Sequence, residues 1–288
     1  MEELLLDIIS RLRCASVTPA ELADIIRLHN NRITDVSKHF SKKKILPFYL
    51  NVKANDPARW KSWGVDESME SALFDILRMK PRRTASGVAT ITVITKPQPC
   101  TSNCVYCPND LRMPKSYLSN EPACQRAERN FFDPYLQVAS RMRALTQMGH
   151  ATDKVELIVL GGTWSDYPQT YQVWFVKELF RALNDWPVHD DALEARCAAY
   201  EEAGIANDPD ALEDFVAAWQ EKVNRREVGY NQAFHGVYDS SAAHGHVAEW
   251  QTATSSELKH EQKRNESADH RVVGLVIETR PDTVNVEN

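Results

Sequence analysis

Apolar residues recur at helical spacing through the first 35 residues of the chain. The first stripe consists of Leu4, Leu5, Ile8, Ile9 and Leu12. Positions three and four residues apart lie on one face of a helix. A second helix is predicted after Thr18, a favourable N-cap, with Pro19 in the first turn and Glu21 placed to complete a capping box. The pattern predicts a helical region over residues 1–80.

The pattern changes to alternating strands and helices from residue 86 onward. Short apolar, β-branched runs predict strands over residues 88–95, 155–160 and 272–277. Helical spacing predicts helices over residues 133–149 and about 171–184. An unbroken apolar run such as 155–160 is expected when both faces of a strand are covered. Because strand–helix repeats build parallel α/β barrels or sheets, residues 81–288 are predicted to be α/β.

Residues 186–257 interrupt this alternation. They contain two acidic stretches with helical character, 192–204 and 208–223, and then a polar run that continues to residue 256. We interpret the segment as an insertion on the periphery of the α/β region. The polar run contains His235, His244 and His246. Their spacing is too irregular for a metal site, so they are expected to lie on the surface.

Composition places the chain among ordinary globular proteins. It has 288 residues, of which 43% are hydrophobic and 26% charged, enough for one large or two smaller domains. No apolar run reaches the roughly 18 residues that a membrane helix requires, and the N-terminus does not resemble a signal peptide. We expect a cytoplasmic protein without membrane contact. The net charge of −6 argues against nucleic-acid binding by bulk charge.

The cations are nevertheless concentrated in two patches. Residues 38–63 hold seven lysines and arginines against one acid, Asp56, with five aromatic residues interleaved. Such a run suits a phosphate backbone with stacked bases, or it is a solvated face whose aromatic side chains lie in the core. The run alone favours the second interpretation, but another patch at residues 78–83 shifts the balance towards RNA. The candidate RNA contacts are Lys42, Lys43, Lys44, Arg82 and Arg83.

Three cysteines follow the first predicted strand at spacing C-x3-C-x2-C: Cys100, Cys104 and Cys107. Three thiolates on one loop can hold three irons of a [4Fe–4S] cluster. The missing fourth ligand would leave one iron open to a small molecule. Structural zinc is the alternative, with a fourth ligand from Cys124 or a histidine, although zinc sites more often show paired C-x2-C knuckles. A disulfide framework does not fit the expected compartment.

The cysteine loop, with an aromatic residue before its last cysteine, resembles the cluster loop of radical S-adenosylmethionine (SAM) enzymes. Further stretches resemble the catalytic subunit of Elongator, a radical SAM tRNA-uridine carboxymethyltransferase. They are residues 83–87, 96–108, 121–123, 130–135, 149–150, 153–163, 171–172, 175–177, 265–266 and 273–282. The Gly-Gly-Thr and Glu-Thr-Arg-Pro-Asp strand ends make the resemblance specific. It covers residues 80–185 and 258–288 well and the N-terminal region more loosely.

The resemblance implies a partial (βα) radical SAM barrel, preceded by the N-terminal helical region. A complete core of this kind has six strand–helix units, so three strands form an incomplete barrel and suggest the N-terminal part of a longer protein. The family's C-terminal acetyltransferase-like domain is absent from the sequence. Two departures from the family are Asn109-Asp110, where a glycine pair is expected, and the length of the 186–257 insertion.

The resemblance also assigns cofactor contacts. The cluster ligands would be Cys100, Cys104 and Cys107, with SAM on the open iron. Tyr106 would lie against the adenine, and Gly161 and Gly162 would let the backbone approach the methionyl amino group. Arg280 suits a carboxylate, and Glu278 suits ribose hydroxyls or a positive centre. The ordinary structural alternative is a salt bridge between Glu278 and Arg280.

The implied reaction is carboxymethylation of C5 of the wobble uridine of tRNA. Reduction of the cluster would cleave SAM to a 5′-deoxyadenosyl radical, which takes hydrogen from the acetyl group of acetyl-CoA. The carbon radical would then add to a uridine splayed out of the anticodon loop. Other Elongator subunits are expected as partners in a eukaryote. The alternative function is a tRNA-binding or scaffold module whose iron–sulfur cluster is structural.

Overall fold

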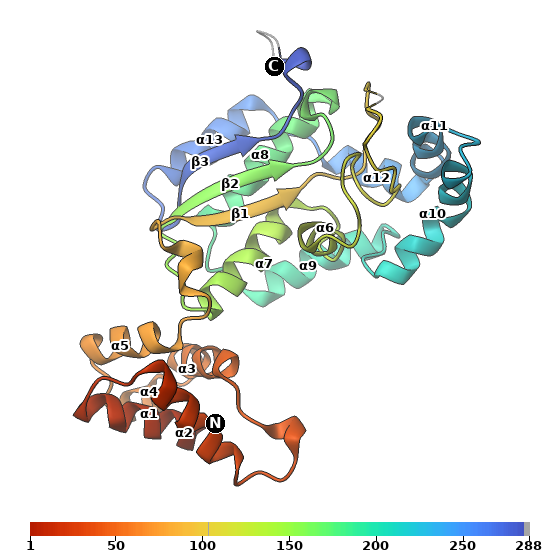
Figure 1. Ribbon diagram of the computed structural model, residues 1–288. Coiled ribbons are helices and arrows are strands. Elements are labelled where there is room, and N and C mark those ends of the chain that lie inside the picture. The colour runs from red at the N-terminus through yellow and green to blue at the C-terminus, as the bar shows by residue number, and fades with distance from the viewer. Residues whose placement is uncertain (103, 285–288) are drawn as a thin grey trace. The chain divides into compact units, whose positions relative to one another are not determined.

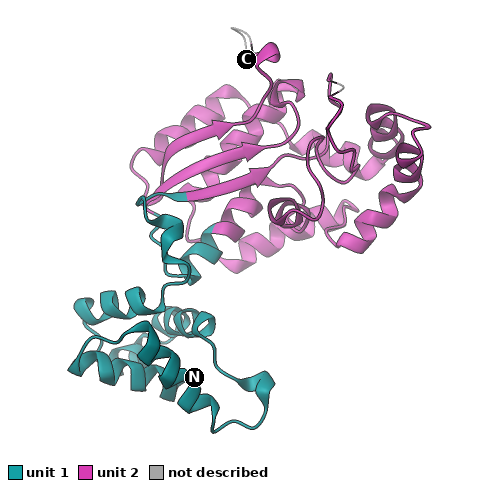
Figure 2. Cartoon of the chain, in the orientation of Figure 1, with its two compact units in different colours: residues 1–89, 142–152 teal, residues 90–141, 153–288 magenta. Residues whose placement is uncertain are grey.

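The computed structural model describes residues 1–102 and 104–284. Residue 103, in the cysteine loop, and residues 285–288, at the end of the stretch that resembles the family, lie outside the described residues. The chain divides into two compact units. Residues 1–89 and 142–152 form the first unit, and residues 90–141 and 153–288 form the second (Figure 2). No helix among the described residues has the length and apolar character that crossing a membrane requires.

The first unit is helical. Its α-helices are α1 (Glu2–Cys14), α2 (Pro19–Asn30), α3 (Lys42–Asn55), α4 (Pro57–Ser62) and α5 (Glu67–Leu77), with short 3-10 turns at Val36–Lys38 and Pro81–Thr84 (Figure 1). The predicted capping box is confirmed at the start of α2. There the Thr18 backbone N–H donates to the Glu21 carboxylate at 2.7 Å, and the Glu21 N–H donates to the Thr18 hydroxyl at 3.3 Å.

The aromatic residues of the basic run lie in the core of this unit. Tyr49 and Trp63 are buried, and Phe40, Phe48 and Trp60 pack against the same apolar cluster. The hydroxyl of Tyr49 donates to Glu70 at 2.8 Å, which satisfies its polar end. This placement favours the interpretation of a solvated face with aromatic side chains in the core, because packing the rings there removes apolar surface from water.

The second unit is built on a three-stranded sheet in the order β1–β2–β3. The strands are β1 (Ala89–Ile94), β2 (Lys154–Leu160) and β3 (Arg271–Ile277), close to the predicted ranges. Strand β2 pairs in parallel with β3, for example Leu157 with Leu275, and the three arrows in Figure 1 point the same way. The α/β class predicted for this part of the chain is confirmed.

Helices α6 (Pro122–Glu128), α7 (Pro134–Gln147), α8 (Gln169–Asn184) and α13 (Ser255–Asn265) accompany the sheet. The side chains of Val155, Leu157 and Val159 in β2 are buried, while the alternate positions are only partly buried. In β3, Val273, Leu275 and Val276 expose 55%, 37% and 48% of their surface. This strand lies at an edge of the sheet formed by the described residues.

The 186–257 segment is helical through most of its length. It contains α9 (Asp190–Glu202), α10 (Pro209–Asn224), α11 (Tyr230–Phe234), a π-helical turn at His235–Asp239 and α12 (Ala242–Trp250). The two acidic helices were predicted. The rest was interpreted as a polar run, yet Tyr230, Phe234 and Val237 are buried there. These elements have one or two turns each, too short for a helical repeat to show in the sequence.

A buried carboxylate joins this segment to the rest of the unit. Asp133 lies directly before α7, where one oxygen accepts the Leu136 backbone N–H at 3.0 Å. Its other oxygen accepts the Tyr200 hydroxyl at 2.7 Å and an Arg196 nitrogen at 2.8 Å, both from α9. Arg196 also reaches Glu178 of α8 at 2.8 Å. One side chain therefore begins α7 and anchors α9.

Replacing Asp133 by alanine should lower the free energy of unfolding by about 3 kcal/mol, because the partly buried Arg196 cation loses one of its two carboxylate partners. Asp208→Ala is the matched control, since Asp208 caps α10 at the surface; its loss should cost about 1 kcal/mol. Urea titrations followed by circular dichroism measure both. Equal losses for the two variants would show that the Asp133 network contributes no more than an ordinary cap.

Candidate functional site at the cysteine loop

The ends of three strands meet at the cysteine loop. The loop leaves the carboxyl end of β1, residues 161–163 follow β2, and residues 278–282 follow β3. Cys100 Sγ lies 3.5 Å from the Thr163 hydroxyl, and Arg280 Nη1 lies 3.7 Å from Cys104 Sγ. Carboxyl ends of parallel strands are where α/β proteins usually place their sites. The structure thus brings together residues that are far apart in the sequence.

The three sulfur atoms have three different neighbours. Cys100 is buried beside Thr163, Cys104 is partly buried beside Arg280, and Cys107 Sγ lies 3.2 Å from the Ser116 hydroxyl. In the part of the chain that the structure describes, no cluster of three or more Cys, His, Asp or Glu side chains is arranged as a metal site. All six cysteines are free thiols. Ligation of a cluster therefore stays a prediction.

The donor set fits an iron–sulfur cluster better than structural zinc. Three thiols stand on one short loop, and thiolates are the usual ligands of such clusters. The candidate fourth zinc ligand, Cys124, is instead buried in an apolar cluster with Ile94 and Met113. Burial raises the pKa of the Cys124 thiol to about 12. The loop tip carries Val105 and Tyr106, which expose 99% and 91% of their surface.

The first residue of the loop is held by the 186–257 segment. The Asn231 side-chain oxygen accepts the Cys100 N–H at 3.0 Å, and its amide nitrogen donates to the Cys100 carbonyl at 2.7 Å. Asp166 accepts the next backbone N–H, that of Thr101, at 2.8 Å. The interpretation of this segment as peripheral is therefore wrong. Asn231 could not be predicted from the sequence, because a side-chain amide bonded to a distant backbone has no characteristic spacing.

The stretch after the cysteines is held in the same way. Gln220 of α10 bonds the Leu111 N–H and the Asn109 carbonyl, at 2.8 and 3.0 Å. The Tyr238 hydroxyl donates to the Leu111 carbonyl at 2.7 Å, and that of Tyr230 donates to the Met113 carbonyl at 2.8 Å. Asn109, which departs from the expected glycine pair, thus has a partner in the segment that is longer than expected.

The two glycines after β2 differ in their surroundings. A Cβ atom at Gly161 would lie 2.0 Å from the Thr95 hydroxyl at the end of β1, so only glycine fits there. At Gly162 the nearest atoms to such a Cβ are backbone atoms of Lys115 at 3.8 Å, an ordinary contact. The close approach of β1 and β2 therefore accounts for Gly161 alone. Contact of either glycine with SAM stays a prediction.

Glu278 and Arg280 do not pair with each other. Glu278 accepts the Tyr117 hydroxyl, and burial together with this carboxylate raises the pKa of Tyr117 well above its usual range. Arg280 binds Asp282, with Nε 2.9 Å from Oδ1, and this bond raises the pKa of the guanidinium. The salt bridge between Glu278 and Arg280, which was the ordinary structural alternative, is not formed, because Glu278 is bonded to Tyr117 and Arg280 to Asp282. Tyr117 and Asp282 were missed from the sequence.

The candidate RNA contacts lie in the first unit. Lys42, Lys43 and Lys44 form the first turn of α3, where Lys43 and Lys44 are exposed. Lys42 is partly buried, which lowers its pKa. Arg82 and Arg83 are exposed on the 3-10 turn Pro81–Thr84. Other cations of the basic run have acidic partners, such as Lys53 with Glu70 and Arg59 with Glu2. Contact with RNA stays a prediction for all five.

The histidines of the 186–257 segment occupy different environments. His235 and His246 are exposed, as expected. His244 is partly buried, with its ring stacked on Phe215 at 5.2 Å between centroids. Burial lowers the pKa of His244 to about 4, so it is neutral near pH 7. The expectation of a surface histidine is therefore wrong at this position.

Comparison with known proteins finds relatives along part of the chain. The tRNA uridine(34) acetyltransferase of Methanocaldococcus jannaschii is 32% identical over 222 residues, which are 75% of this chain and 29% of that protein. The enzyme of the same name from Methanocaldococcus infernus is 43% identical over 41% of this chain and 23% of its own length. Elongator complex protein 3 of Homo sapiens is 41% identical over 42% of this chain and 24% of the human protein.

The chain thus spans about a quarter of the length of these relatives. No protein-family model matches it. Among solved structures, the archaeal Methanocaldococcus infernus Elp3 with an N-terminal deletion aligns with 70% of this chain and 25% of its own, at 24% identity and a TM-score of 0.35, too low to establish a shared fold. The sequence identities nevertheless make this chain a homologue of the tRNA uridine(34) acetyltransferases and Elongator complex protein 3, the family that its strand-end motifs predicted.

Proposed function

We propose that this chain forms part of a radical SAM enzyme that carboxymethylates the wobble uridine of tRNA, using acetyl-CoA as co-substrate. The observation that carries the proposal is the convergence of Cys100, Cys104, Thr163 and Arg280 at the carboxyl ends of the strands. The names of the relatives support the tRNA substrate. Because the chain covers about a quarter of their length, activity belongs to the longer protein and the acetyl-CoA site has no residue assigned here.

In this proposal Cys100, Cys104 and Cys107 hold a [4Fe–4S] cluster. The bound cluster would supply the electron for reductive cleavage of SAM, while the protein positions the reactants and excludes water. Arg280 would offer its planar donor fork to the SAM carboxylate. Its bond to Asp282 shows that the guanidinium already holds a carboxylate at this place. Exposed Tyr106, between two of the ligands, would close over the adenine.

The edge of the sheet supports a larger barrel. Strand β3 exposes Val273, Leu275 and Val276, and exposed apolar edge strands are unusual in proteins because they invite pairing with another strand. We include in the proposal that further strand–helix units continue the sheet beyond β3. The three strands would then be the first part of a partial radical SAM barrel, with the candidate site at its mouth.

The start of α3 supports contact with tRNA phosphates. Positive charges at a helix N-terminus oppose the helix dipole, so three lysines there are unfavourable without an anion. The N-cap residue Ser41 makes no capping bond, and its buried hydroxyl has no partner among the described residues. Phosphate at this position would receive backbone N–H groups and the lysine charges together. Other Elongator subunits are proposed partners in a eukaryote, where relatives carry that name.

Anaerobic reconstitution should load about four irons and four sulfides per chain. Replacing Cys100, Cys104 or Cys107 by alanine should abolish this loading, while Cys14→Ala and Cys124→Ala should retain it, because neither lies on the loop. Metal and sulfide analysis with visible absorption measures the outcome. Stoichiometric zinc that iron does not replace would contradict the cluster assignment.

Added SAM should perturb the electron paramagnetic resonance spectrum of the reduced cluster. In Arg280→Ala, the SAM concentration needed for half of the spectral change should rise about tenfold, because a charged hydrogen bond to the carboxylate is lost. The iron content should be unchanged. Asp282→Ala is the control: it frees Arg280 and should leave SAM binding equal or tighter. If the spectrum of the wild-type protein does not change when SAM is added, the alternative function, a scaffold with a structural cluster, is favoured.

Replacing Lys42, Lys43 and Lys44 by glutamate should weaken binding of all tRNAs alike, because phosphate contacts carry no sequence information. The slope of log affinity against log salt should become shallower by about 2–3, roughly one unit for each lost contact. In the control variant, the exposed Lys222, Lys259 and Lys263 of the second unit are replaced by glutamate, which gives the same change in net charge. Anisotropy titrations across ionic strength measure both variants. Equal affinities and slopes for wild type and the first variant would assign these lysines to a solvated face.

A further inference from the structure

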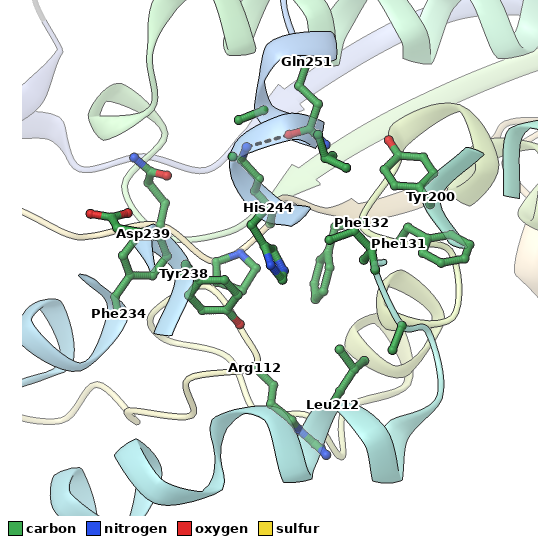
Figure 3. A pocket seen from close by; sticks show the side chains of 18 of the residues that line it. Arg112, Phe131, Phe132, Tyr200, Leu212, Phe234, Tyr238, Asp239, His244 and Gln251 are labelled. Carbon is green, nitrogen blue, oxygen red and sulfur yellow. Dashed lines mark hydrogen bonds between the residues drawn. The ribbon is translucent and has the colours of Figure 1, made fainter. Parts of the chain in front are cut away.

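A cavity of about 320 Å³ lies in the second unit, between the segment leading to Cys100 and the helices of residues 186–257. Several ring side chains line it, as Figure 3 shows: Phe131, Phe132, Tyr200, Phe234, Tyr238 and His244. Ligand pockets in proteins have this size and this character, with a few polar groups that fix orientation. None of the residues proposed to contact the cluster or SAM lines it.

Lys96 supplies the positive charge of the cavity. Its backbone carbonyl accepts the Tyr167 hydroxyl at 2.7 Å, which fixes the residue at the end of β1. In the described part of the chain, Nζ contacts the Gln251 oxygen at 2.5 Å and the Tyr171 ring at 4.8 Å from its centroid. Both partners are uncharged. A partly buried ammonium beside uncharged partners is unfavourable, and desolvation accordingly lowers the pKa of Lys96 to about 8.

The other charged groups of the wall already have partners. Arg112 Nε lies 3.4 Å from a Glu128 oxygen, and Asp239 pairs with His235 at 2.7 Å. His244 is neutral near pH 7, and its Nδ1 lies 2.9 Å from the Ser241 hydroxyl. Arg112 Nη1 also lies 3.3 Å from a Glu213 oxygen, so Lys96 is the cation of this wall for which an added anion would supply a partner.

The backbone of the wall is irregular at two places. Phe131 and Phe132 both have left-handed backbone angles, with φ of 55° and 53°. Bulky residues rarely adopt this conformation, and such strain clusters at ligand sites. On the opposite side, Tyr238 and Asp239 belong to the π-helical turn His235–Asp239, an irregularity that is frequent at functional sites. Both departures present aromatic side chains to the cavity.

We propose that this cavity binds a planar aromatic carboxylate, with its carboxylate on Lys96 and its ring among Phe132, Tyr238 and His244. The aromatic walls favour a planar apolar body, since offset and edge-to-face ring contacts add to the burial of area. The Gln251 amide shares the polar end with Lys96. The site is separate from the proposed cluster site, and the inference does not depend on the proposed function.

The probes are 2-naphthoate and its neutral analogue 2-naphthamide, titrated into the whole chain by calorimetry. Wild-type protein should bind one 2-naphthoate, at least about tenfold more tightly than 2-naphthamide, because only the acid carries the charge that Lys96 lacks. Lys96→Met should lower the affinity for 2-naphthoate about tenfold and change that for 2-naphthamide by less than about twofold. Lys259→Met, at an exposed lysine of α13, should change neither.

A second variant tests the place of binding. Gly245 lines the cavity on α12, and a Cβ atom there meets no other atom within 4 Å. Gly245→Phe should fill the cavity and abolish binding of both probes without loss of thermal stability, because glycine is an unfavourable residue inside a helix. The proposal is overturned if wild type binds neither probe or prefers neither, if Lys96→Met retains full affinity for 2-naphthoate, or if Gly245→Phe still binds.

Discussion

The two hydrogen bonds between the Asn231 side-chain amide and the Cys100 backbone hold the cysteine loop to a helix 131 residues further along the chain. Each bond satisfies a backbone group that a surface loop would otherwise leave to water. The loop of the candidate site is therefore shaped by the 186–257 segment as well as by the strand that precedes it. Gln220, Tyr230 and Tyr238 extend the same arrangement to the stretch after the cysteines.

This arrangement depends in turn on how the 186–257 segment is anchored. Asp133 at the start of α7 holds Arg196 and Tyr200 of α9, and Phe131 stacks on Tyr200 with ring centroids 4.9 Å apart. Tyr200 and Phe131 are also part of the cavity wall. The same contacts thus anchor the segment and shape the cavity beside Lys96. The buried carboxylate is useful here because it fixes orientation, which apolar contacts alone specify less strictly.

In the first unit, the aromatic and basic residues that alternate along the sequence lie in different environments. Its aromatic residues are in the core, while Lys43 and Lys44 remain exposed at the start of α3. Helical periodicity places the aromatic and the basic side chains on different faces, because residues three and four positions apart share a face and adjacent residues do not. The helix N-terminus then places its own positive partial charge beside the lysines. Positive charge at the N-terminus of α3 therefore comes from the helix dipole as well as from the lysine side chains.

The sequence by itself determined the three strands, the main helices, the Thr18 capping box and the spacing of Cys100, Cys104 and Cys107. These features depend on residues close together in the chain, whose periodicity and capping chemistry are local. Tertiary structure decided that Lys96 lies against Gln251, that Asn231 holds Cys100, and that Glu278 accepts the Tyr117 hydroxyl. Hydrogen-bond partners and burial at these positions depend on elements brought together only by folding, because a single polar residue leaves no periodic pattern from which its partner can be predicted.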